Sequence, residues 1–366
     1  MPDFKYKLRI STPGRVCLFG EHQDYLNLPI VASAISLRIS ISGKRRNDNI
    51  IQISLPDISK IEIINLAESI TYTEERDYFK SSLNILLRKG YTFSTGFDCT
   101  VHGRIPINAG TSSSSALIVT WINFLTQMSN QAEILSGEEL AKLAHEAEVL
   151  EFSEPGGMMD HFSTSIGGII SIDFLPTISV QKINAPLKTF VLGNSNEPKD
   201  TKYILAHVKN RIIDITAKLQ KEDRNFSLLT VEEKNLKEYK RFITDSQYQL
   251  LEGTIENRNL TKEAKQELNK SEIDHKQIGK LLTEHQRVLR DILGISTLKI
   301  DSMIEAALKA GAYGAKINGS GGGGCMFAYA PEEPDRVRKA IESIGSEAFT
   351  IHSDSGTREE LWEEEN

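Results

Sequence analysis

The sequence predicts a protein of mixed α-helices and β-strands arranged in two domains. At 366 residues, the chain is longer than one compact core of usual size requires. Its first half combines strand-like and helical segments, whereas the stretch from about residue 200 to residue 292 is charged and helical. We therefore place a domain boundary near residue 185 and expect domains at residues 1–185 and 186–366.

Strand patterns dominate the beginning of the chain. Residues 7–12 and 29–43 are rich in Ile, Val, Leu and Ser and flank a turn signal at Thr12-Pro13-Gly14. Residues 50–72 alternate apolar and polar side chains, and this alternation predicts further strand.

Helices and short strands alternate in the rest of the chain. We expect helices over residues 76–90, from 116, from 136, over much of 200–292 and over 298–310, and strands over 97–104, 166–174, 313–317 and 325–329. Ser136 and Glu139 have the spacing of a capping box at a helix start, and Gly311 suits the position just after a helix end. The buried stripe of the helix from 136 includes Ala144 and Ala147, which puts Glu148 at its edge.

Composition and charge exclude several classes of protein. The formal net charge is -7 and no block of Lys and Arg is present, so a nucleic-acid binder is not expected. Cys17, Cys99 and Cys325 lie far apart, which fits neither a zinc site nor a disulfide framework. The start lacks the pattern of a signal peptide, and no apolar run approaches the roughly 20 residues of a membrane helix. We expect a cytoplasmic protein that does not bind membranes.

Three loops carry residues suited to chemistry, and the first is the segment Pro13-Gly14-Arg15-Val16-Cys17-Leu18-Phe19-Gly20-Glu21-His22-Gln23-Asp24-Tyr25. It places a cation, two carboxylates and an imidazole in a turn between apolar strands. Such groups can hold vicinal hydroxyls through several directed hydrogen bonds. Taken alone, the same segment would also fit a polar surface loop.

The second loop, Asn108-Ala109-Gly110-Thr111-Ser112-Ser113-Ser114-Ser115, runs into an apolar helix. Small residues let a phosphate approach the backbone, and a helix N-terminus supplies N–H groups and partial positive charge. The spacing is not that of the P-loop. A flexible serine loop is the alternative, but such a loop is rarely set between a strand and an apolar helix.

The third loop, Asn318-Gly319-Ser320-Gly321-Gly322-Gly323-Gly324, formally matches a dinucleotide-binding fingerprint. A strand rather than a helix is expected after it, so a Rossmann oxidoreductase is excluded by context. Glycines between two strands instead favour close backbone approach to another loop or to a ligand.

Together, in this order, the three loops resemble the signature motifs of the GHMP small-molecule kinases, the family of galactokinase, homoserine kinase, mevalonate kinase and phosphomevalonate kinase. The resemblance runs from about residue 8 to residue 330. It implies an α+β fold with an N-terminal domain like the second domain of ribosomal protein S5 and a ferredoxin-like C-terminal domain. ATP and substrate would meet in the cleft between these domains.

The first motif looks like the galactokinase signature. In galactokinases the Glu, His and Asp of this motif bind sugar hydroxyls, which implies substrate contacts for Glu21, His22 and Asp24. Gln23 stands where Thr is usual, and Cys17 stands where Asn is usual.

The middle of the chain extends the resemblance. Glu148 stands twelve residues before Asp160, the spacing of a metal-binding Glu and the catalytic Asp of a Gly-x-Met-Asp segment in galactokinases. Gly157 begins that segment here and is expected at the substrate. Gly156 and His161 stand where Cys and Gln are usual.

The resemblance implies an ATP-dependent phosphotransferase with an alcohol group as acceptor. The expected nucleotide-binding residues are Ala109, Gly110, Thr111, Ser112, Ser113, Ser114, Gly321 and Gly322. Ser114 and Glu148 are the candidate Mg²⁺ ligands, since a hydroxyl and one carboxylate leave most of an octahedral shell to phosphate and water. Asp160 would accept the proton of the attacking anomeric hydroxyl, with Arg15 beside it, giving a sugar 1-phosphate and ADP.

The resemblance leaves the substrate open between galactose and related acceptors. The unusual residues Gln23, Gly156 and His161 admit a heptose, a uronic acid, arabinose, an N-acetylhexosamine or mevalonate. A non-catalytic galactokinase-like sugar sensor is a further alternative, although the groups implied in catalysis are all present. The assembly is expected to be a monomer or a homodimer, and the role of the charged stretch 215–275 stays open.

Overall fold

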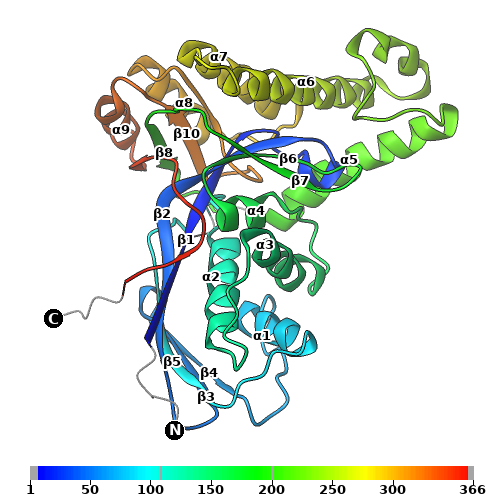
Figure 1. Cartoon of the computed structure of the whole chain (residues 1–366). Helices are drawn as coiled ribbons and strands as arrows, with labels where there is room; N and C mark the ends of the chain where they lie inside the picture. The colour runs from blue at the N-terminus through cyan, green and yellow to red at the C-terminus, as the bar shows by residue number, and fades with distance from the viewer. Residues whose placement is uncertain (1–6, 108, 199–200, 362–366) are drawn as a thin grey trace.

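The structure, a computed structural model, describes residues 7–107, 109–198 and 201–361 of the chain. Two domains lie one above the other, and both termini lie at the first of them (Figure 1). The elements of the first domain are β1 (Lys7–Phe19), β2 (Ile30–Arg45), β3 (Ile50–Leu55), β4 (Lys60–Asn65), α1 (Tyr78–Arg88), β5 (Phe97–Gly103), α2 (Ser113–Met128), α3 (Gly137–His145), α4 (Met159–Ile166), β6 (Ile169–Asp173) and β7 (Ser179–Ile183). The elements that follow are β8 (Phe190–Asn194), α5 (Thr201–Glu222), α6 (Asp245–Leu268), α7 (His275–Arg287), α8 (Leu298–Lys309), β9 (Gly314–Ile317), β10 (Cys325–Tyr329), α9 (Pro334–Glu342), β11 (Glu347–Ile351) and β12 (Arg358–Glu359).

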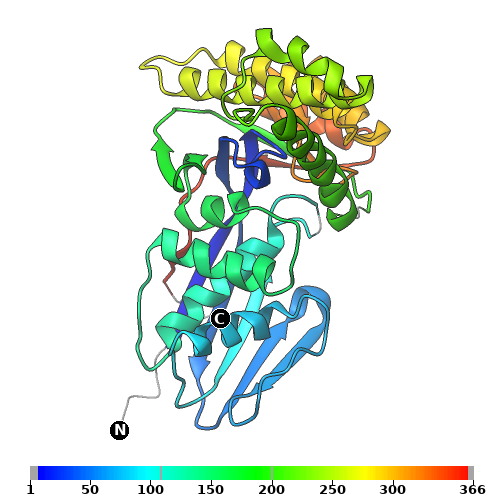
Figure 2. The same cartoon turned by 90° about the vertical axis from the view of Figure 1, so that its right-hand side faces the viewer.

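The first domain is built on an eight-stranded sheet in the order β12-β1-β2-β5-β3-β4, with β6 paired to β2 and β7 to β6. The pair β3–β5 is parallel and the others are antiparallel. Helices α1 to α4 cover one face of this sheet (Figures 1 and 2). The core beneath them contains the rings of Phe97, Trp121 and Phe124, which are fully buried in mutual contact.

The second domain contains a four-stranded antiparallel sheet in the order β11-β8-β10-β9. Helices α8 and α9 pack on this sheet, and α6 and α7 form a layer at the far end of the molecule (Figure 1). The charged stretch expected to be helical therefore forms α5, α6 and α7. Every helix within the described residues is too short or too polar to cross a lipid bilayer.

The structure confirms the signals predicted for two helix ends and contradicts the turn predicted within the first strand. Ser136 and Glu139 form the predicted capping box of α3, and Gly311 follows α8 with a φ of 107°. The turn expected at Thr12-Pro13-Gly14 is wrong, because β1 continues to Phe19 and absorbs these residues in a register shift against β2.

The end of the chain returns to the first domain. The chain leaves the first sheet at Ile183 and enters the second sheet at Phe190. After β11, residues 352–360 return to the first domain, where β12 pairs with β1. The expected extent of the second domain, residues 186–366, is therefore too long. No local signal marks this crossing, since it depends on pairing between the two ends of the chain.

Candidate active site

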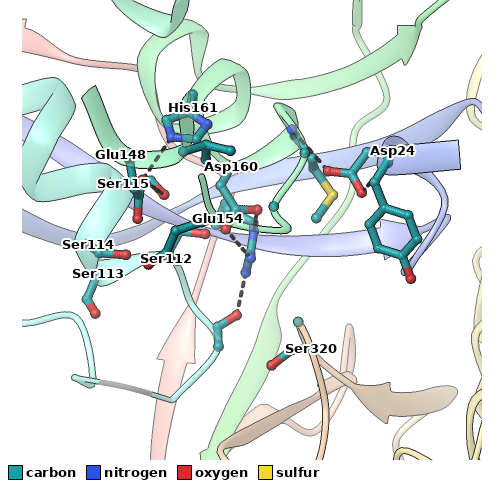
Figure 3. Close-up of a pocket in the computed structure, with 18 of the residues that line it drawn as sticks. Asp24, Ser112, Ser113, Ser114, Ser115, Glu148, Glu154, Asp160, His161 and Ser320 are labelled. Atoms are coloured by element: carbon teal, nitrogen blue, oxygen red, sulfur yellow. Dashed lines mark hydrogen bonds and ion pairs between the residues drawn. The ribbon is translucent and has the colours of Figure 1, made fainter. Parts of the chain in front are cut away.

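A polar cavity of about 170 Å³ lies where loops of the first domain meet the glycine loop of the second domain. Its wall comes from β1 and the loop after it, the start of α2, a π-helical turn after α3, the start of α4, and Gly319 with Ser320. Asp24, Glu148 and Asp160 reach it from three different elements (Figure 3).

The Arg15 guanidinium and the Asp160 carboxylate form a two-point ion pair at this cavity. Nε and Nη2 of Arg15 donate to the two carboxylate oxygens over 2.8 and 2.7 Å, and Nη1 donates to the carbonyl oxygen of Gly110. The bulge in β1 sets this position. A Cβ on Gly14 would lie 2.8 Å from the carbonyl oxygen of Thr111, and the Arg15 N–H donates to that same oxygen over 3.1 Å.

Asp160 is the second residue of α4, where the helix dipole favours a carboxylate. Burial by itself would raise the pKa of this carboxyl, but the charge and hydrogen bonds of Arg15 outweigh burial and hold the pKa below its ordinary value of 3.8. Asp160 is therefore ionised at neutral pH and can accept a proton from a hydroxyl in the cavity.

Asp24 opens the 3₁₀ turn η1 (Asp24–Leu26) and faces the start of α4. Its Oδ1 accepts from the backbone N–H of Tyr25 over 2.9 Å, and its Oδ2 accepts from that of Met159 over 3.4 Å. Gly157 makes this approach possible, because a Cβ there would lie 2.0 Å from Asp24 Oδ2. Burial, reinforced by the negative charge of Asp160, raises the pKa of Asp24 to about 6.

The imidazole of His22 is fixed between the two domains. Its Nε2 lies 3.0 Å from the carbonyl oxygen of Ser320, which can only accept, so Nε2 carries a hydrogen. Its Nδ1 lies 2.6 Å from the hydroxyl of Tyr25. The backbone of His22 is held at a φ of 62°, a conformation seldom taken by residues other than glycine.

Glu21 borders the cavity, but its carboxylate faces the second domain. One oxygen is ion-paired with Lys316 and the other accepts from the backbone N–H of Gly319. Glu21 is 1% exposed and Lys316 is fully buried. Of the three predicted substrate-binding side chains of the first motif, Glu21 is therefore the one held in a buried ion pair with the second domain.

The serine loop brings the N-terminus of α2 to the cavity. Ser112, Ser113, Ser114 and Ser115 all line it, and they are labelled in Figure 3. The first-turn N–H groups of a helix have no intrahelical acceptor, and the helix dipole adds positive charge there. This end of α2 suits an anionic group such as a phosphate.

Glu148 lies in a π-helical turn, Glu146–Leu150, that continues α3. The wider turn moves Glu148 from the predicted edge of the helix into the interior, where it is 8% exposed. Its Oε2 accepts from Ser115 Oγ over 2.7 Å and from His161 Nε2 over 2.8 Å. Burial would raise the pKa of Glu148, but His161 and the hydroxyls of Ser114 and Ser115 bring the pKa below its ordinary value.

An ionised carboxylate close to a serine hydroxyl is the oxygen donor set that Mg²⁺ accepts, so Glu148 and Ser114 fit this ion. Within the described residues, no cluster of three or more His, Cys, Asp or Glu side chains is suited to a metal. A magnesium ion at Glu148 would therefore depend on phosphate and water for most of its ligands.

An apolar cavity of about 550 Å³ adjoins the polar one. The two share Tyr78, Ser113 and Ser114. The apolar wall includes Ile39, Leu55, Val101, Ile105, Ile107 and Phe349. A molecule with a flat apolar end and an anionic end can therefore span both cavities across the start of α2.

Three family models match the chain in its N- to C-terminal order. The galactokinase galactose-binding signature matches residues 3–45, the GHMP kinases N-terminal domain matches 77–168, and the GHMP kinases C-terminal domain matches 264–348. Together they cover more than half of the chain. The chain belongs to the GHMP kinase family.

Individual relatives agree on the family and divide on the substrate. The mevalonate kinase of Thermococcus onnurineus is 28% identical, with 95% of this chain and 97% of that protein aligned. The galactokinase of Enterococcus faecalis is 27% identical, with 91% and 87% aligned. The fold of this GHMP kinase matches the crystal structure of Lactococcus lactis galactokinase complexed with galactose, with a TM-score of 0.84, 22% identity and coverage of 97% and 96%.

Most of the site residues expected of a GHMP kinase meet at the polar cavity, and four do not. Ala109 and Thr111 are buried behind the serine loop, where Ala109 accepts from the N–H of Cys325. Gly321 and Gly322 face the second domain instead, since a Cβ on either would meet Ile295 or Ile204. The physical reason is that the glycine loop packs against the serine loop through its two ends: added Cβ atoms on Gly319 and Gly324 would lie 2.7 and 2.6 Å from the carbonyl oxygens of Gly110 and Ala109.

Sequence reasoning missed a second ion pair at the cavity. Nε and Nη2 of Arg76 donate to the carboxylate of Glu154 over 2.5 and 2.6 Å, and both residues line the cavity. Tyr78 and His161 were also not expected to face it. None of these residues belongs to a glycine-rich or serine-rich motif, so only the fold brings them here.

Two residues that depart from the galactokinase pattern lie outside the cavity wall. Gln23 is 1% exposed and borders a void of about 10 Å³ against α5 and α6. Its side-chain amide makes no hydrogen bond to the described residues. Cys17 is buried, and its backbone N–H donates to Asn318 Oδ1 over 2.9 Å. Neither side chain can change a substrate contact directly.

Proposed function

We propose that this GHMP kinase transfers the γ-phosphoryl group of ATP to the anomeric hydroxyl of galactose or a closely related neutral sugar, giving a sugar 1-phosphate and ADP. One observation carries the proposal. An ionised carboxylate, Asp160, faces the same cavity as the N-terminus of α2, which suits phosphate, and as His22 and Asp24, which suit hydroxyls.

Asp160 is proposed as the general base. Its low pKa keeps it ready to accept the proton of the attacking hydroxyl, and the fork of Arg15 fixes its orientation. Arg15 is 4% exposed, so its charge acts in a poorly solvated place, where charge stabilisation of a moving phosphoryl group is strongest. Phosphoryl transfer depends mainly on positioning and electrostatics, so these groups are sufficient for catalysis.

We propose that the nucleotide spans both cavities. The base would enter the apolar cavity, and the phosphates would cross the start of α2 at Ser113 and Ser114. Ser114 and Glu148 would hold Mg²⁺, which neutralises phosphate charge when bound. His161 supports Glu148 by donating to its Oε2 over 2.8 Å.

The charge of the cavity favours a neutral acceptor. Among the described residues that line it, both arginines are already in two-point ion pairs, Arg15 with Asp160 and Arg76 with Glu154. An acceptor with its own carboxylate, such as mevalonate, would need a cation that these pairs do not leave available. A sugar needs only partners for its hydroxyl groups, and the Asp24 carboxyl provides one at this cavity.

Mevalonate is nevertheless the second candidate, because mevalonate kinases of 26–28% identity cover more than nine-tenths of the chain. Heptoses, arabinose and N-acetylhexosamines are further neutral candidates, since Gly156 lines the cavity where galactokinases usually have Cys. A uronic acid meets the same objection as mevalonate, because it carries a carboxylate.

The test is ADP release from Mg-ATP with galactose, glucose, mannose, arabinose, galacturonate, N-acetylgalactosamine, a mannoheptose or mevalonate as acceptor. We expect turnover with galactose or another neutral sugar. Turnover with mevalonate alone would overturn the proposed acceptor and keep the kinase mechanism. Tight ATP binding without turnover on any acceptor would favour a sugar sensor.

A further inference from the structure

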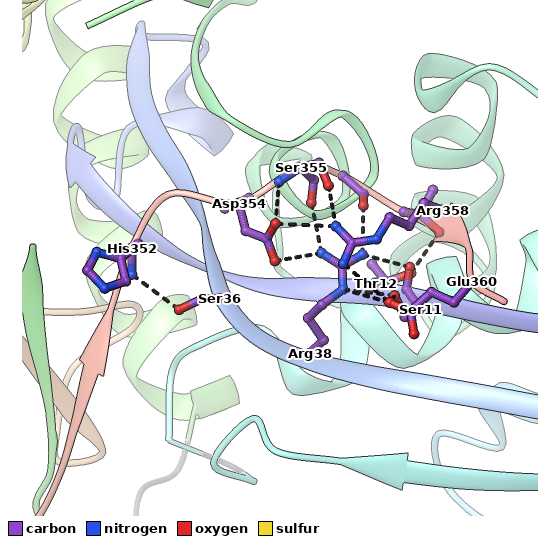
Figure 4. A network of polar contacts seen from close by, with 12 residues as sticks. Ser11, Thr12, Ser36, Arg38, His352, Asp354, Ser355, Arg358 and Glu360 are labelled. Atoms are coloured by element: carbon purple, nitrogen blue, oxygen red, sulfur yellow. Dashed lines mark hydrogen bonds and ion pairs between the residues drawn. The ribbon is translucent and has the colours of Figure 1, made fainter. Parts of the chain in front are cut away.

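The segment of residues 352–360 lies outside every matched family model, since the last of these ends at residue 348. It leaves the second domain after Ile351 and returns to the first sheet, where its strand β12 pairs with β1 at the sheet edge (Figure 4). Along this path it contacts β1, β2 and the end of α4. We call residues 352–360 the strap.

Arg38, on β2, is the main polar anchor of the strap. Its Nη1 donates to Asp354 Oδ2 over 2.9 Å and to the carbonyl oxygen of Ser355 over 3.0 Å, and its Nη2 donates to the carbonyl oxygen of Gly356 over 2.8 Å. Nε and Nη2 also donate to the hydroxyl and carbonyl oxygens of Ser11 over 2.8 and 3.0 Å. The guanidinium therefore joins the strap to β1 through all of its nitrogens (Figure 4).

The strap also holds the end of α4. The N–H of Gly168 donates to the carbonyl oxygen of Asp354 over 2.7 Å, and the N–H of Thr357 donates to that of Ser165 over 3.1 Å. The backbones approach so closely that a Cβ on Gly356 would lie 2.1 Å from the carbonyl oxygen of Ser165. There is no space for even a methyl group between the strap and α4.

Thr357 connects the strap to two buried side chains of the first domain. Its hydroxyl lies 2.8 Å from that of Thr12 on β1 and accepts from Asn123 Nδ2 on α2 over 3.0 Å. Thr12 is fully buried, and Asn123 is 5% exposed. This contact is thus a built part of the interior and not a loose surface association.

We propose that the strap positions the Arg15–Asp160 pair for catalysis. It contacts Ser11, whose hydroxyl donates to Glu360 Oε1 over 2.6 Å, and Thr12, both just before Arg15 on β1. It also contacts Ser165 and Gly168, which lie one helix length after Asp160. The strap therefore holds together the two elements that carry the ion pair, β1 beside Arg15 and α4 at the end opposite Asp160. The proposal rests on the proposed function, in which Asp160 is the general base.

Loosening the strap has a specific chemical consequence at Asp160. The charged or titratable groups that face this carboxylate are Arg15 from β1, Asp24 from η1 and His161 from α4 itself. Burial raises the pKa of Asp160, and Arg15 is the main group that opposes this effect. If α4 moves away from β1, the pKa of Asp160 rises and the base becomes protonated at a higher pH.

Two variants test the strap, each with its own comparison. Gly356→Ala forces the strap away from α4 without a change in charge. Thr357→Val removes one hydroxyl, and Thr357→Ser keeps it. Arg358→Gln is the control within the strap, because Arg358 is 44% exposed and, among the described residues, its side chain bonds only to strap residues Asp354, Ser355 and Glu360.

We expect Gly356→Ala to lower kcat by about tenfold or more, with the KM values for sugar and ATP within about twofold, because misplacement of a reacting group by about 1 Å carries a cost of this order. The acid limb of the kcat profile should move to higher pH. Thr357→Val should show the same change to a smaller extent, while Thr357→Ser and Arg358→Gln should resemble the wild type.

If Gly356→Ala lowers the melting temperature but leaves kcat and the acid limb of its pH profile unchanged, the strap stabilises the fold without positioning the ion pair, and the proposal is wrong. Equal losses in Thr357→Val and Thr357→Ser would do the same. The pKa of Asp160, measured by carboxyl ¹³C NMR in the wild type and in Gly356→Ala, needs no turnover. An unchanged pKa of Asp160 in Gly356→Ala would refute the positioning role of the strap, and a raised pKa would support it. Either result holds even if the acceptor panel contradicts the proposed sugar kinase activity.

Discussion

Asp160 and Asp24 face the same cavity, yet their surroundings shift their pKa values in opposite directions. Burial acts against ionisation of both. At Asp160 the guanidinium of Arg15 more than compensates, so the pKa falls below its ordinary value. Asp24 receives only backbone N–H groups, at 2.9 and 3.4 Å, and feels the charge of Asp160, so its pKa rises to about 6.

The comparison shows that the partner, and not the depth of burial, decides the direction in which the pKa of each carboxyl shifts. A group that must accept a proton benefits from a cation that keeps it ionised. A group that holds a hydroxyl can use either state, since a neutral carboxyl can donate as well as accept. The two environments therefore fit the roles of general base for Asp160 and substrate ligand for Asp24.

Substitution of Asp160 should lower kcat more than any other change considered. Asp160→Asn should lower kcat by more than about a hundredfold, because the amide cannot accept the proton of the attacking hydroxyl. Sugar affinity, measured by calorimetry in the presence of a non-hydrolysable ATP analogue, should stay close to that of the wild type. Near-normal turnover would remove Asp160 from the role of base.

Arg15→Gln should lower kcat at neutral pH by roughly a hundredfold, the lower end of the cost of losing one charge-stabilising donor. The pKa of Asp160 should rise, because burial then acts without the opposing charge of Arg15. The acid limb of the kcat profile should therefore move to higher pH. Arg15→Lys is the matched control, which keeps the charge without the fork. If the acid limb is identical in wild type and Arg15→Gln, Arg15 does not set the pKa of the base.

Asp24→Asn should raise the KM for sugar by about tenfold, the value of one hydrogen bond to a charged group, and change kcat less. The same variant should gain stability at pH 7 by about 1 kcal/mol, a modest value because Asp24 keeps some solvent contact. The folded-state pKa of about 6 is above the ordinary 3.8, so ionising Asp24 costs stability as pH rises through this window.

Thermal unfolding of the wild type and Asp24→Asn as a function of pH checks the sign. The gain should be fully present above about pH 6 and should vanish below about pH 4, where Asp24 is protonated in the unfolded state as well as in the folded state. A gain that does not depend on pH would mean that the carboxyl of Asp24 is not perturbed.

The smallest change in kcat is expected for His161, whose side chain is hydrogen-bonded to Glu148. His161→Gln introduces the residue usual in galactokinases and keeps a donor for Glu148 Oε2. We expect kcat and both KM values within about threefold of the wild type, the scale of a retained neutral hydrogen bond. A shift toward another sugar in the acceptor panel would instead make His161 a determinant of specificity.

Motifs with local signals were found from sequence, and contacts between distant segments were not. The three loops, the spacing from Glu148 to Asp160 and the capping box of Ser136 each lie within a short stretch of chain. The ion pair of Glu21 with Lys316 joins residues 295 positions apart, and the hydrogen bond from Thr12 to Thr357 joins residues 345 positions apart. No periodicity or turn signal records such pairs.

The π-helical turn at Glu146–Leu150 illustrates a finer limit. Helical periodicity places Glu148 at the edge of the buried stripe, but a single inserted residue rotates the side chain into the core. Hydrogen bonds from Ser115 and His161 make that burial tolerable for a carboxylate, and both donors come from other elements. The sequence singled out Glu148, whereas its buried environment depended on the assembled fold.

The most direct test of the account is one reaction that contains equal amounts of galactose and mevalonate with limiting Mg-ATP, followed by ³¹P NMR of the products. We expect a phosphate coupled to the anomeric proton of the sugar and little phosphorylated mevalonate. Phosphomevalonate as the main product, with galactose unchanged, would contradict the proposed acceptor and show that this cavity accommodates a carboxylate.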